Sequence, residues 1–318
     1  MRALVRRYGT PCGFLVVILF FALSLPDTFL TGRNWLNITA QVSMLTVVAA
    51  AMTIVMVMGD FDLSVGSMAS LAGVVAAVLF VHGCPVAPAV AAALVVGVAG
   101  GAINGVLVSL IGILPFIATL ATLTIFSGAA FLLSGGKTIF GRDIPSAFSD
   151  FARAGLPLGE IGGQALRLPY LTIVAIAVVL SVWVILEQTT FGRRLYAIGG
   201  NREAARLAGV HVKRLRLGAF ALTGLGAALA GLMYASRVAS ANPTQGSGLM
   251  LNAIAAVFLG MTMSEEGEPR VLATLVGVLI LGVLDNGLTQ LSVGSYVRDI
   301  LVGIIILAAV SSSAAWRR

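Results

Sequence analysis

The apolar positions of the chain fall into ten runs, each about as long as a helix that crosses a bilayer. Such a helix needs roughly 20 apolar residues, because each residue adds about 1.5 Å of rise and the hydrocarbon core is about 30 Å thick. Polar residues gather between the runs, most of all at 134–168. The pattern predicts ten transmembrane helices, at 12–30, 36–58, 64–82, 86–110, 114–133, 169–187, 217–236, 249–263, 271–290 and 297–313.

The composition excludes a water-soluble protein. Hydrophobic residues make up 58% of the 318 residues and charged residues only 10%, and the mean hydropathy is +1.02. A soluble domain carries about 25% charged residues, so most of this surface must contact lipid. Ten helices and their loops account for nearly all of the chain. We therefore expect an all-α, polytopic membrane protein with one transmembrane domain at 1–318.

The distribution of charge predicts how the helices are oriented. Basic residues outnumber acidic ones seven to one in the segment 189–216, and they also occupy both ends of the chain, whereas 134–168 is mixed. Ten spans place all the strongly basic segments on one side, and basic loops stay in the cytoplasm. We expect both termini and 189–216 in the cytoplasm and 134–168 in the periplasm. The net charge of +7 follows from this arrangement, and basic residues that only flank apolar runs do not indicate nucleic-acid binding.

A weak internal repeat divides the chain into two halves. Gly-Gly-Ala-Ile-Asn-Gly at 100–105 resembles Gly-Val-Leu-Asp-Asn-Gly at 282–287, and each lies near the end of a span that one more span follows. The copies are five spans apart, and an odd offset gives them opposite orientations. Inverted repeats are common in transporters, so the pattern favours two inverted five-helix halves. The alternative is that Asn-Gly is simply a frequent end of a helix.

The basic segment contains a short predicted helix at 201–209. Gly199-Gly200 interrupts any helix arriving from the membrane, Asn201 is a good N-cap, and Glu203 in the first turn suits the helix dipole. Ala204 and Ala205 favour the helix and Gly209 ends it. A helix this short is marginal in water, so it needs a surface to dock on. That surface is either a groove on another protein or the underside of the bundle itself.

Polar residues within or beside the spans are the candidates for a translocation path. Asp60 and Asp62 lie where the second span ends, and carboxylates at membrane depth suggest function; they cap the third helix together with Ser64, line a substrate path, or bind an ion. Asparagine and threonine inside spans either hydrogen-bond a substrate or join helices. The path residues we select are Asp62, Ser64, Asn104, Phe116, Thr119, Asn252 and Asn286.

No catalytic chemistry or cofactor is indicated. The two histidines, His82 and His211, fall on opposite faces of the predicted membrane, and no cysteine–histidine spacing suits a metal. Gly136-Lys137-Thr138 lacks the earlier glycine of a phosphate-binding loop, because position 131 is Phe131. The chain is therefore expected to carry no nucleotide site, and energy must come from a partner or an ion gradient.

Several motifs resemble those of ribose-type monosaccharide permeases of ABC importers. Glu203-Ala204-Ala205 with Gly209 looks like the EAA loop of importer permeases. The wider strings at 192–210, 62–67, 104–105, 114–120 and 252–257 occur in the same order, and the resemblance covers roughly 35–310. It implies a bacterial inner-membrane subunit that pairs with a second permease copy or a paralogue, a cytoplasmic ABC ATPase and a periplasmic substrate-binding protein. It also implies that 201–209 is the helix that couples the permease to ATP hydrolysis.

The sequence thus predicts the permease subunit of an ATP-driven importer for a monosaccharide or related small polyol. The ATPase-coupling residues are Gly199, Asn201, Glu203, Ala204, Ala205 and Gly209. The alternative is an ion-coupled secondary transporter with Asp60, Asp62 or Asp285 as its ion site, which explains the repeat but not an isolated alanine-rich helix. A membrane-embedded enzyme is disfavoured because no acid–base pair or metal group lies deep in a span.

Overall fold

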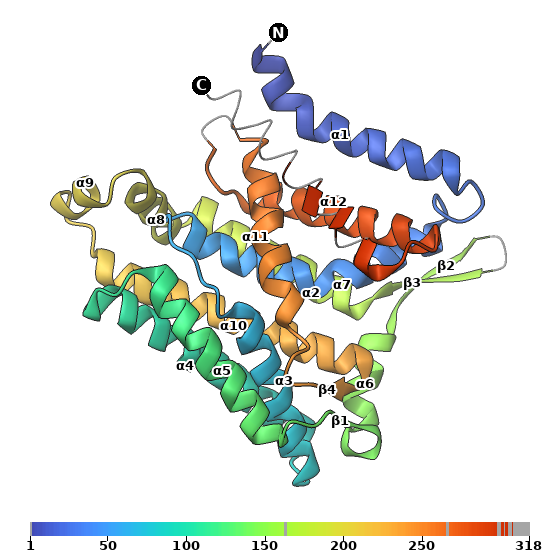
Figure 1. The fold of residues 1–318 in the computed structure, drawn as a ribbon, viewed down its shortest axis with the longest axis horizontal. Coiled ribbons are helices and arrows are strands. Elements are labelled where there is room, and N and C mark those ends of the chain that lie inside the picture. The colour runs from blue at the N-terminus through green and yellow to red at the C-terminus, as the bar shows by residue number, and fades with distance from the viewer. Residues whose placement is uncertain are drawn as a thin grey trace.

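The computed structural model describes residues 2–161, 164–264 and 267–297, with positions 300, 301, 303, 304 and 307. This part of the chain is mostly helical (Figure 1). Two π-helical stretches, η1 (Leu107–Ile111) and η3 (Val184–Gln188), prolong α4 and α7, and η2 (Gly141–Asp143) is a 3-10 turn. The α-helices are α1 (Arg2–Ser24), α2 (Gly32–Met56), α3 (Val65–Val81), α4 (Val86–Val106), α5 (Pro115–Ser134), α6 (Ser146–Arg153), α7 (Tyr170–Trp183), α8 (Thr190–Gly200), α9 (Arg202–Leu207), α10 (Val212–Val238), α11 (Ser247–Met261) and α12 (Val271–Gln290).

The first nine predicted runs each contain a helix. Within the described residues, six helices are long and apolar enough to cross a membrane: α2, α4 with η1, α5, α7 with η3, α10 and α12. The apolar part of α1 (Gly9–Ser24), α3 and α11 are shorter. The tenth run, 297–313, lies largely outside the described residues, as do Arg317 and Arg318. The chain is therefore a multi-pass membrane protein.

The core lies around α2 and α10, which pack against each other and against most of the other long helices. Every residue of α2 from Val47 to Met56 is buried. Glycines on α4 let that helix approach α10 closely: a Cβ at Gly101 would strike the carbonyl of Phe220, and one at Gly105 would come within 2.8 Å of the Leu217 Cα. Small residues at such contacts allow helices to pack in lipid, where no hydrophobic effect drives them together.

The order of helix lengths repeats along the chain. The series α2, α3, α4 has 25, 17 and 21 residues, and the series α10, α11, α12 has 27, 15 and 20. The turn before the short helix is also the same in both. Asp62 Oδ1 accepts from the N–H and hydroxyl of Ser64 at 2.9 and 2.6 Å, and Asn242 Oδ1 accepts from those of Thr244 at 2.8 and 2.7 Å. These correspondences are what an internal duplication produces.

The expected loop at 134–168 is folded, so the chain is not wholly helical. Strand β1 (Ile139–Phe140) pairs antiparallel with β4 (Ser240–Ala241), and β2 (Gly155–Ile161) pairs antiparallel with β3 (Gln164–Pro169). Along the chain, the helix α6 lies between β1 and β2. Its Phe148 packs on Phe80 of α3 with ring centroids 5.1 Å apart. Leu156 and Leu158 alternate with other residues along β2, which is the period-two signal of a strand.

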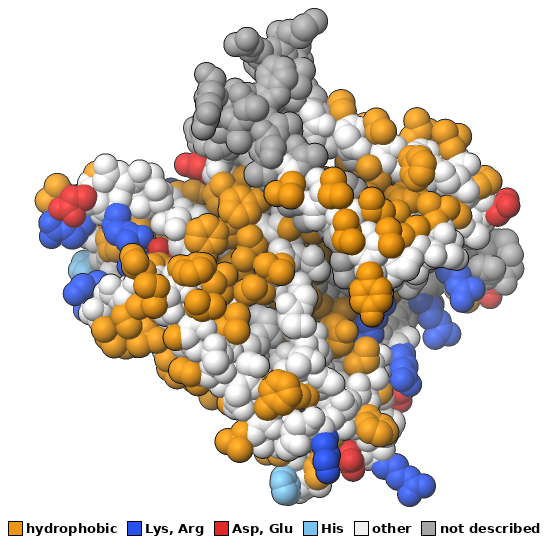
Figure 2. All heavy atoms as spheres, in the orientation of Figure 1, with side chains coloured by type: hydrophobic (Ala, Val, Ile, Leu, Met, Phe, Trp, Pro, Cys, Tyr) orange, Lys and Arg blue, Asp and Glu red, His pale blue; other side chains and the backbone are white. Residues whose placement is uncertain are grey.

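The polar segments collect at two opposite ends of the molecule. Figure 1 shows α8 and α9 at one end and the β2–β3 hairpin at the other. In Figure 2, charged side chains concentrate at both of these ends, and hydrophobic side chains cover much of the surface between them. Leu132 and Ile125 of α5 and Leu180 of α7 are among the exposed apolar residues of the long helices. Such a band is what lipid requires of a membrane protein.

Candidate functional site

The short helix α9 forms where the sequence predicts it. Asn201 is its N-cap, and Asn201 Oδ1 accepts from the Ala204 N–H at 2.9 Å. Gly209 has a φ of +81°, a left-handed conformation that follows the end of the helix and that only glycine adopts freely. The guanidinium of Arg206 donates to Glu203 at 2.6 and 3.0 Å, and this hydrogen bonding lowers the pKa of the Glu203 carboxyl. The helix is therefore locally specified by its own side chains.

The predicted coupling residues point in different directions. Glu203 and Ala204 are exposed, whereas Ala205 is buried against its own chain and its methyl group does not face solvent. Gly199 lies at the end of α8, where a Cβ would strike the carbonyl of Val57 just after α2. Gly199 and Ala205 thus seat α8 and α9 on the bundle, while the outer face of α9 stays open. On that face Leu207 is 75% exposed.

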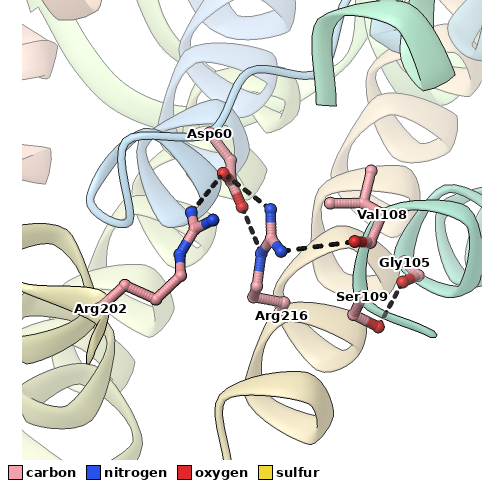
Figure 3. Close-up of polar contacts among 6 residues, drawn as sticks. All are labelled: Asp60, Gly105, Val108, Ser109, Arg202 and Arg216. Carbon is pink, nitrogen blue, oxygen red and sulfur yellow. Dashed lines mark hydrogen bonds and ion pairs between the residues drawn. The ribbon is translucent and has the colours of Figure 1, made fainter. Parts of the chain in front are cut away.

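Asp60, whose role the sequence leaves open, binds two arginines (Figure 3). Arg216, near the start of α10, donates through Nε to Asp60 Oδ2 at 2.8 Å and through Nη2 to Oδ1 at 3.0 Å. Arg202, the first residue of α9, donates to Oδ1 at 3.1 Å. Arg216 also reaches the Val108 carbonyl of η1 at 3.4 Å. Asp60 and Arg216 are buried, so each neutralises the other at a depth where a lone charge is costly.

Asp62, Ser64 and Asn104 form a second buried polar cluster. Ser64 does not cap α3 through its side chain; its hydroxyl donates to Asp62 instead. Asn104 Nδ2 donates to Ser64 Oγ at 2.8 Å, and Asn104 Oδ1 accepts from the Thr122 hydroxyl at 2.7 Å. The cluster joins the start of α3 to α4 and α5. With these partners, neither Asp60 nor Asp62 offers an unengaged carboxylate for a coupling ion.

The starts of α3 and α11 meet in the interior of the protein. A Cβ at Gly66 would come within 2.6 Å of the Gly246 carbonyl oxygen, and the Gly246 N–H donates to Ser70 Oγ at 2.9 Å. Both helices are shorter than the hydrocarbon core, about 25 and 22 Å by their residue counts. A cavity of about 230 Å³ lies at this junction. Its lining is mainly apolar, with Leu63, Leu123 and Met250, and also includes serines and one threonine: Ser67, Ser70, Ser127, Thr244 and Ser247.

The remaining predicted path residues are dispersed. Asn252 lines a larger cavity of about 880 Å³, which borders α2, α10, α11 and α12 and shares Thr244 and Ser247 with the smaller one. Asn286 is buried and accepts from Gln290 at 2.8 Å. Thr119 is buried and donates to the carbonyl of Pro115 in its own helix at 2.8 Å, and Phe116 is exposed on α5.

Sequence reasoning missed the residues that connect these regions. Arg202 and Arg216 stand out in the sequence only as members of a basic segment. One signal could have indicated the pair of Asp60 and Arg216. Asp60 follows one apolar run and Arg216 precedes another, and a buried carboxylate requires a cation as its partner. The serines of the small cavity carried no such signal, because serine in a membrane helix usually bonds its own backbone.

Long apolar helices between two polar ends, with cavities between the helices, are the architecture of a membrane transport protein. The family model described as the permease component of the branched-chain amino acid transport system matches residues 34–310. The chain belongs to this family.

Curated relatives extend the match to nearly the full length. The ribose import permease protein of Bacillus subtilis is 39% identical over 306 residues, which is 96% of this chain and 92% of that protein. The ribose import permease protein of Escherichia coli K12 is 38% identical over 93% of this chain and 90% of its own length. The L-arabinose transport system permease protein of Escherichia coli K12 is 36% identical over 96% and 89%. No solved structure matches the chain.

These relatives are transport subunits, and the chain is a transport subunit rather than an enzyme. The comparisons give no support to ion-coupled secondary transport.

Proposed function

We propose that this chain is the membrane-spanning permease subunit of an ATP-driven ABC importer that carries a monosaccharide or related small polyol across the bacterial inner membrane. The observation that supports it most is the match to ribose and arabinose permeases over nearly the whole chain. The geometry adds a capped helix exposed at one polar end and a cavity between helices whose lining includes serine and threonine residues. Hydroxyl groups suit a sugar, which both donates and accepts hydrogen bonds.

The proposed topology has ten spans in two inverted five-helix halves, with both termini in the cytoplasm. The repeated order of helix lengths and the matching turns at Asp62 and Asn242 support the two halves. Contacts between segments that connect the helices support the assignment of these segments to the two sides of the membrane. Asn242 bonds Thr138 at one end of the molecule, and Arg202 bonds Asp60 at the other. The basic excess of 189–216 favours the α9 end as the cytoplasmic one.

The proposed partners bind the two polar ends. The exposed face of α9, with Glu203, Ala204 and Leu207, is assigned to a groove on the cytoplasmic ATPase. Asn201 and Gly209 shape the helix, and Gly199 and Ala205 hold it on the bundle. The opposite end, with α6 and the β2–β3 hairpin, is assigned to a periplasmic substrate-binding protein. A second permease copy or a paralogue completes the assembly within the bilayer.

The proposed path runs through the two cavities that meet at the start of α11. A sugar enters the larger cavity beside Asn252 and passes Thr244 and Ser247 into the smaller one between the helix starts. Asp62, Ser64, Asn104 and Asn286 support the path by fixing the helices around it. Alternating access then requires the start of α3 or α11 to move, because the two starts are in direct contact beside the smaller cavity.

Transport in reconstituted vesicles tests the proposal. The permease is purified with its partner ATPase and substrate-binding protein, placed in proteoliposomes, and supplied with radiolabelled ribose, arabinose or allose. We expect sugar uptake only when ATP is supplied to the ATPase. Uptake should stop when the ATPase carries an inactivating substitution, and it should continue when ionophores abolish the proton and sodium gradients. Uptake that follows an ion gradient without ATP would contradict the proposal.

A further inference from the structure

We propose that Arg202, Asp60 and Arg216 form the link that carries movement of α9 to the buried helix junction, with Arg216 as the fixed partner of Asp60 and Arg202 as the moving one. This rests on the proposed function, because it assumes that α9 is moved by an ATPase. The three residues are positioning residues: none of them lines either of the two cavities.

The link begins at the first residue of α9. Arg202 reaches out of the helix to Asp60 at 3.1 Å, in the segment that connects α2 to α3. Asp60 lies two residues before Asp62, whose carboxylate holds the Ser64 turn at the start of α3. A displacement of α9 is therefore passed along a few bonded residues to the helix start that bounds the 230 Å³ cavity.

The two arginines differ in how firmly they are held. Arg216 makes two hydrogen bonds to Asp60, its side chain is 9% exposed, and it also contacts the Val108 carbonyl. The side chain of Arg202 is 49% exposed and makes one of these hydrogen bonds. Water can replace the Arg202 contact but not the Arg216 pair, so only the former can form and break cheaply during a cycle.

The position of Arg216 connects the same carboxylate to a second element. Its Nη1 donates to Val108 in η1, the π-helical stretch that prolongs α4. Val108 lies in the last turns of this helix, where carbonyl groups lack a partner within the helix and side chains can bind them. Asp60 is thus bonded at once to α9 and α10, and through Arg216 to the end of α4, as Figure 3 shows.

Substitution of the exposed arginine tests the link without endangering the fold. The reconstituted importer is prepared with Arg202→Gln, Arg202→Lys, and Arg270→Gln as the matched control. Arg270 also pairs with a carboxylate, Glu187 at 3.8 Å, and its side chain is 52% exposed. We expect Arg202→Gln to assemble in normal amounts but to move at least fivefold fewer sugars per ATP hydrolysed, Arg202→Lys to recover much of that ratio, and Arg270→Gln to match the wild type.

A double-substitution cycle separates a link from a general disturbance. If Arg202 acts through Asp60, Arg202→Gln should lower the ratio no further in an Asp60→Asn background. The inference would be overturned if Arg202→Gln kept the wild-type number of sugars moved per ATP, or if its loss equalled that of Arg270→Gln. It would also be overturned if the losses from Arg202→Gln and Asp60→Asn were fully additive. Absence of ATP-driven uptake in the wild type would instead contradict the proposed function, so the two failures are distinguishable.

Discussion

Asn104 is a buried polar residue whose side chain is engaged by residues of neighbouring helices. Its amide donates to Ser64 and accepts from Thr122, and the residue is fully buried between three helices. Asn252, selected from the sequence on the same grounds, is exposed to the larger cavity. Residue type alone does not distinguish an asparagine that joins helices from one that faces a cavity; the number of its protein partners does.

Replacing each asparagine by leucine should give opposite results. Asn104→Leu leaves the Ser64 hydroxyl and Thr122 without their shared partner, so the free energy of unfolding should fall by about 1–3 kcal/mol. Asn252→Leu removes no such network, so its stability should change by roughly 0.5 kcal/mol or less, while sugar uptake slows. Thermal unfolding in detergent and uptake in vesicles measure the two effects. Equal destabilisation by both substitutions would contradict the distinction.

Among the elements, α3 and α11 matter most for the path because their starts touch. Each is the short helix in its series of three, and their contact at Gly66 and Gly246 leaves no room for a side chain. Neighbouring Gly248, the second residue of α11, has open space around it. The two glycines therefore form a matched pair for testing the junction.

Gly246→Ala should destabilise the protein by about 1–3 kcal/mol, because its Cβ would collide with the Gly66 carbonyl and force the helix starts apart. Gly248→Ala should be neutral or stabilising by up to about 1 kcal/mol, since alanine favours a helix over glycine. Thermal unfolding of the two variants side by side checks this. Tolerance of alanine at 246 would mean that the junction is loose.

The outer face of α9 should bind its partner through an apolar contact. Leu207→Glu places a charge where a groove is expected to be apolar, so binding of the ATPase should weaken at least tenfold, which corresponds to about 1.4 kcal/mol. Leu207→Met keeps size and polarity and should bind normally. Co-purification and ATPase stimulation measure the effect, and unchanged assembly of Leu207→Glu would place the contact elsewhere.

The elements were more predictable than their partners. Nine apolar runs, the N-cap of α9 and the glycine at its end follow from local sequence, because hydropathy and capping depend on a few neighbouring residues. The hairpin β2–β3 was expected to be loop, although Leu156 and Leu158 alternate as in a strand. The arginine partners of Asp60 depend on contacts across 142 and 156 residues of chain, which local patterns do not contain.

For the whole molecule, the two polar ends should lie on opposite sides of the membrane. A reporter active only in the cytoplasm should be active when fused after residue 200, in the basic segment, and inactive when fused after residue 150, on α6. The expected orientation follows from the basic excess of 189–216. The reverse pattern of activities would mean that the orientation is opposite to the one proposed. Activity at both sites would mean that no odd number of spans separates residues 150 and 200.

The buried pair of Asp60 and Arg216 also bears on how the protein is made. Ribosomes add about 5–20 residues per second, so the 156 residues that separate the pair take roughly 8–30 s to synthesise. During that interval the nascent first half holds an acidic residue at the membrane with its permanent counter-charge still untranslated. A chain truncated before residue 216 keeps Asp60 without this counter-charge, so we expect it to be degraded rather than to accumulate in the membrane.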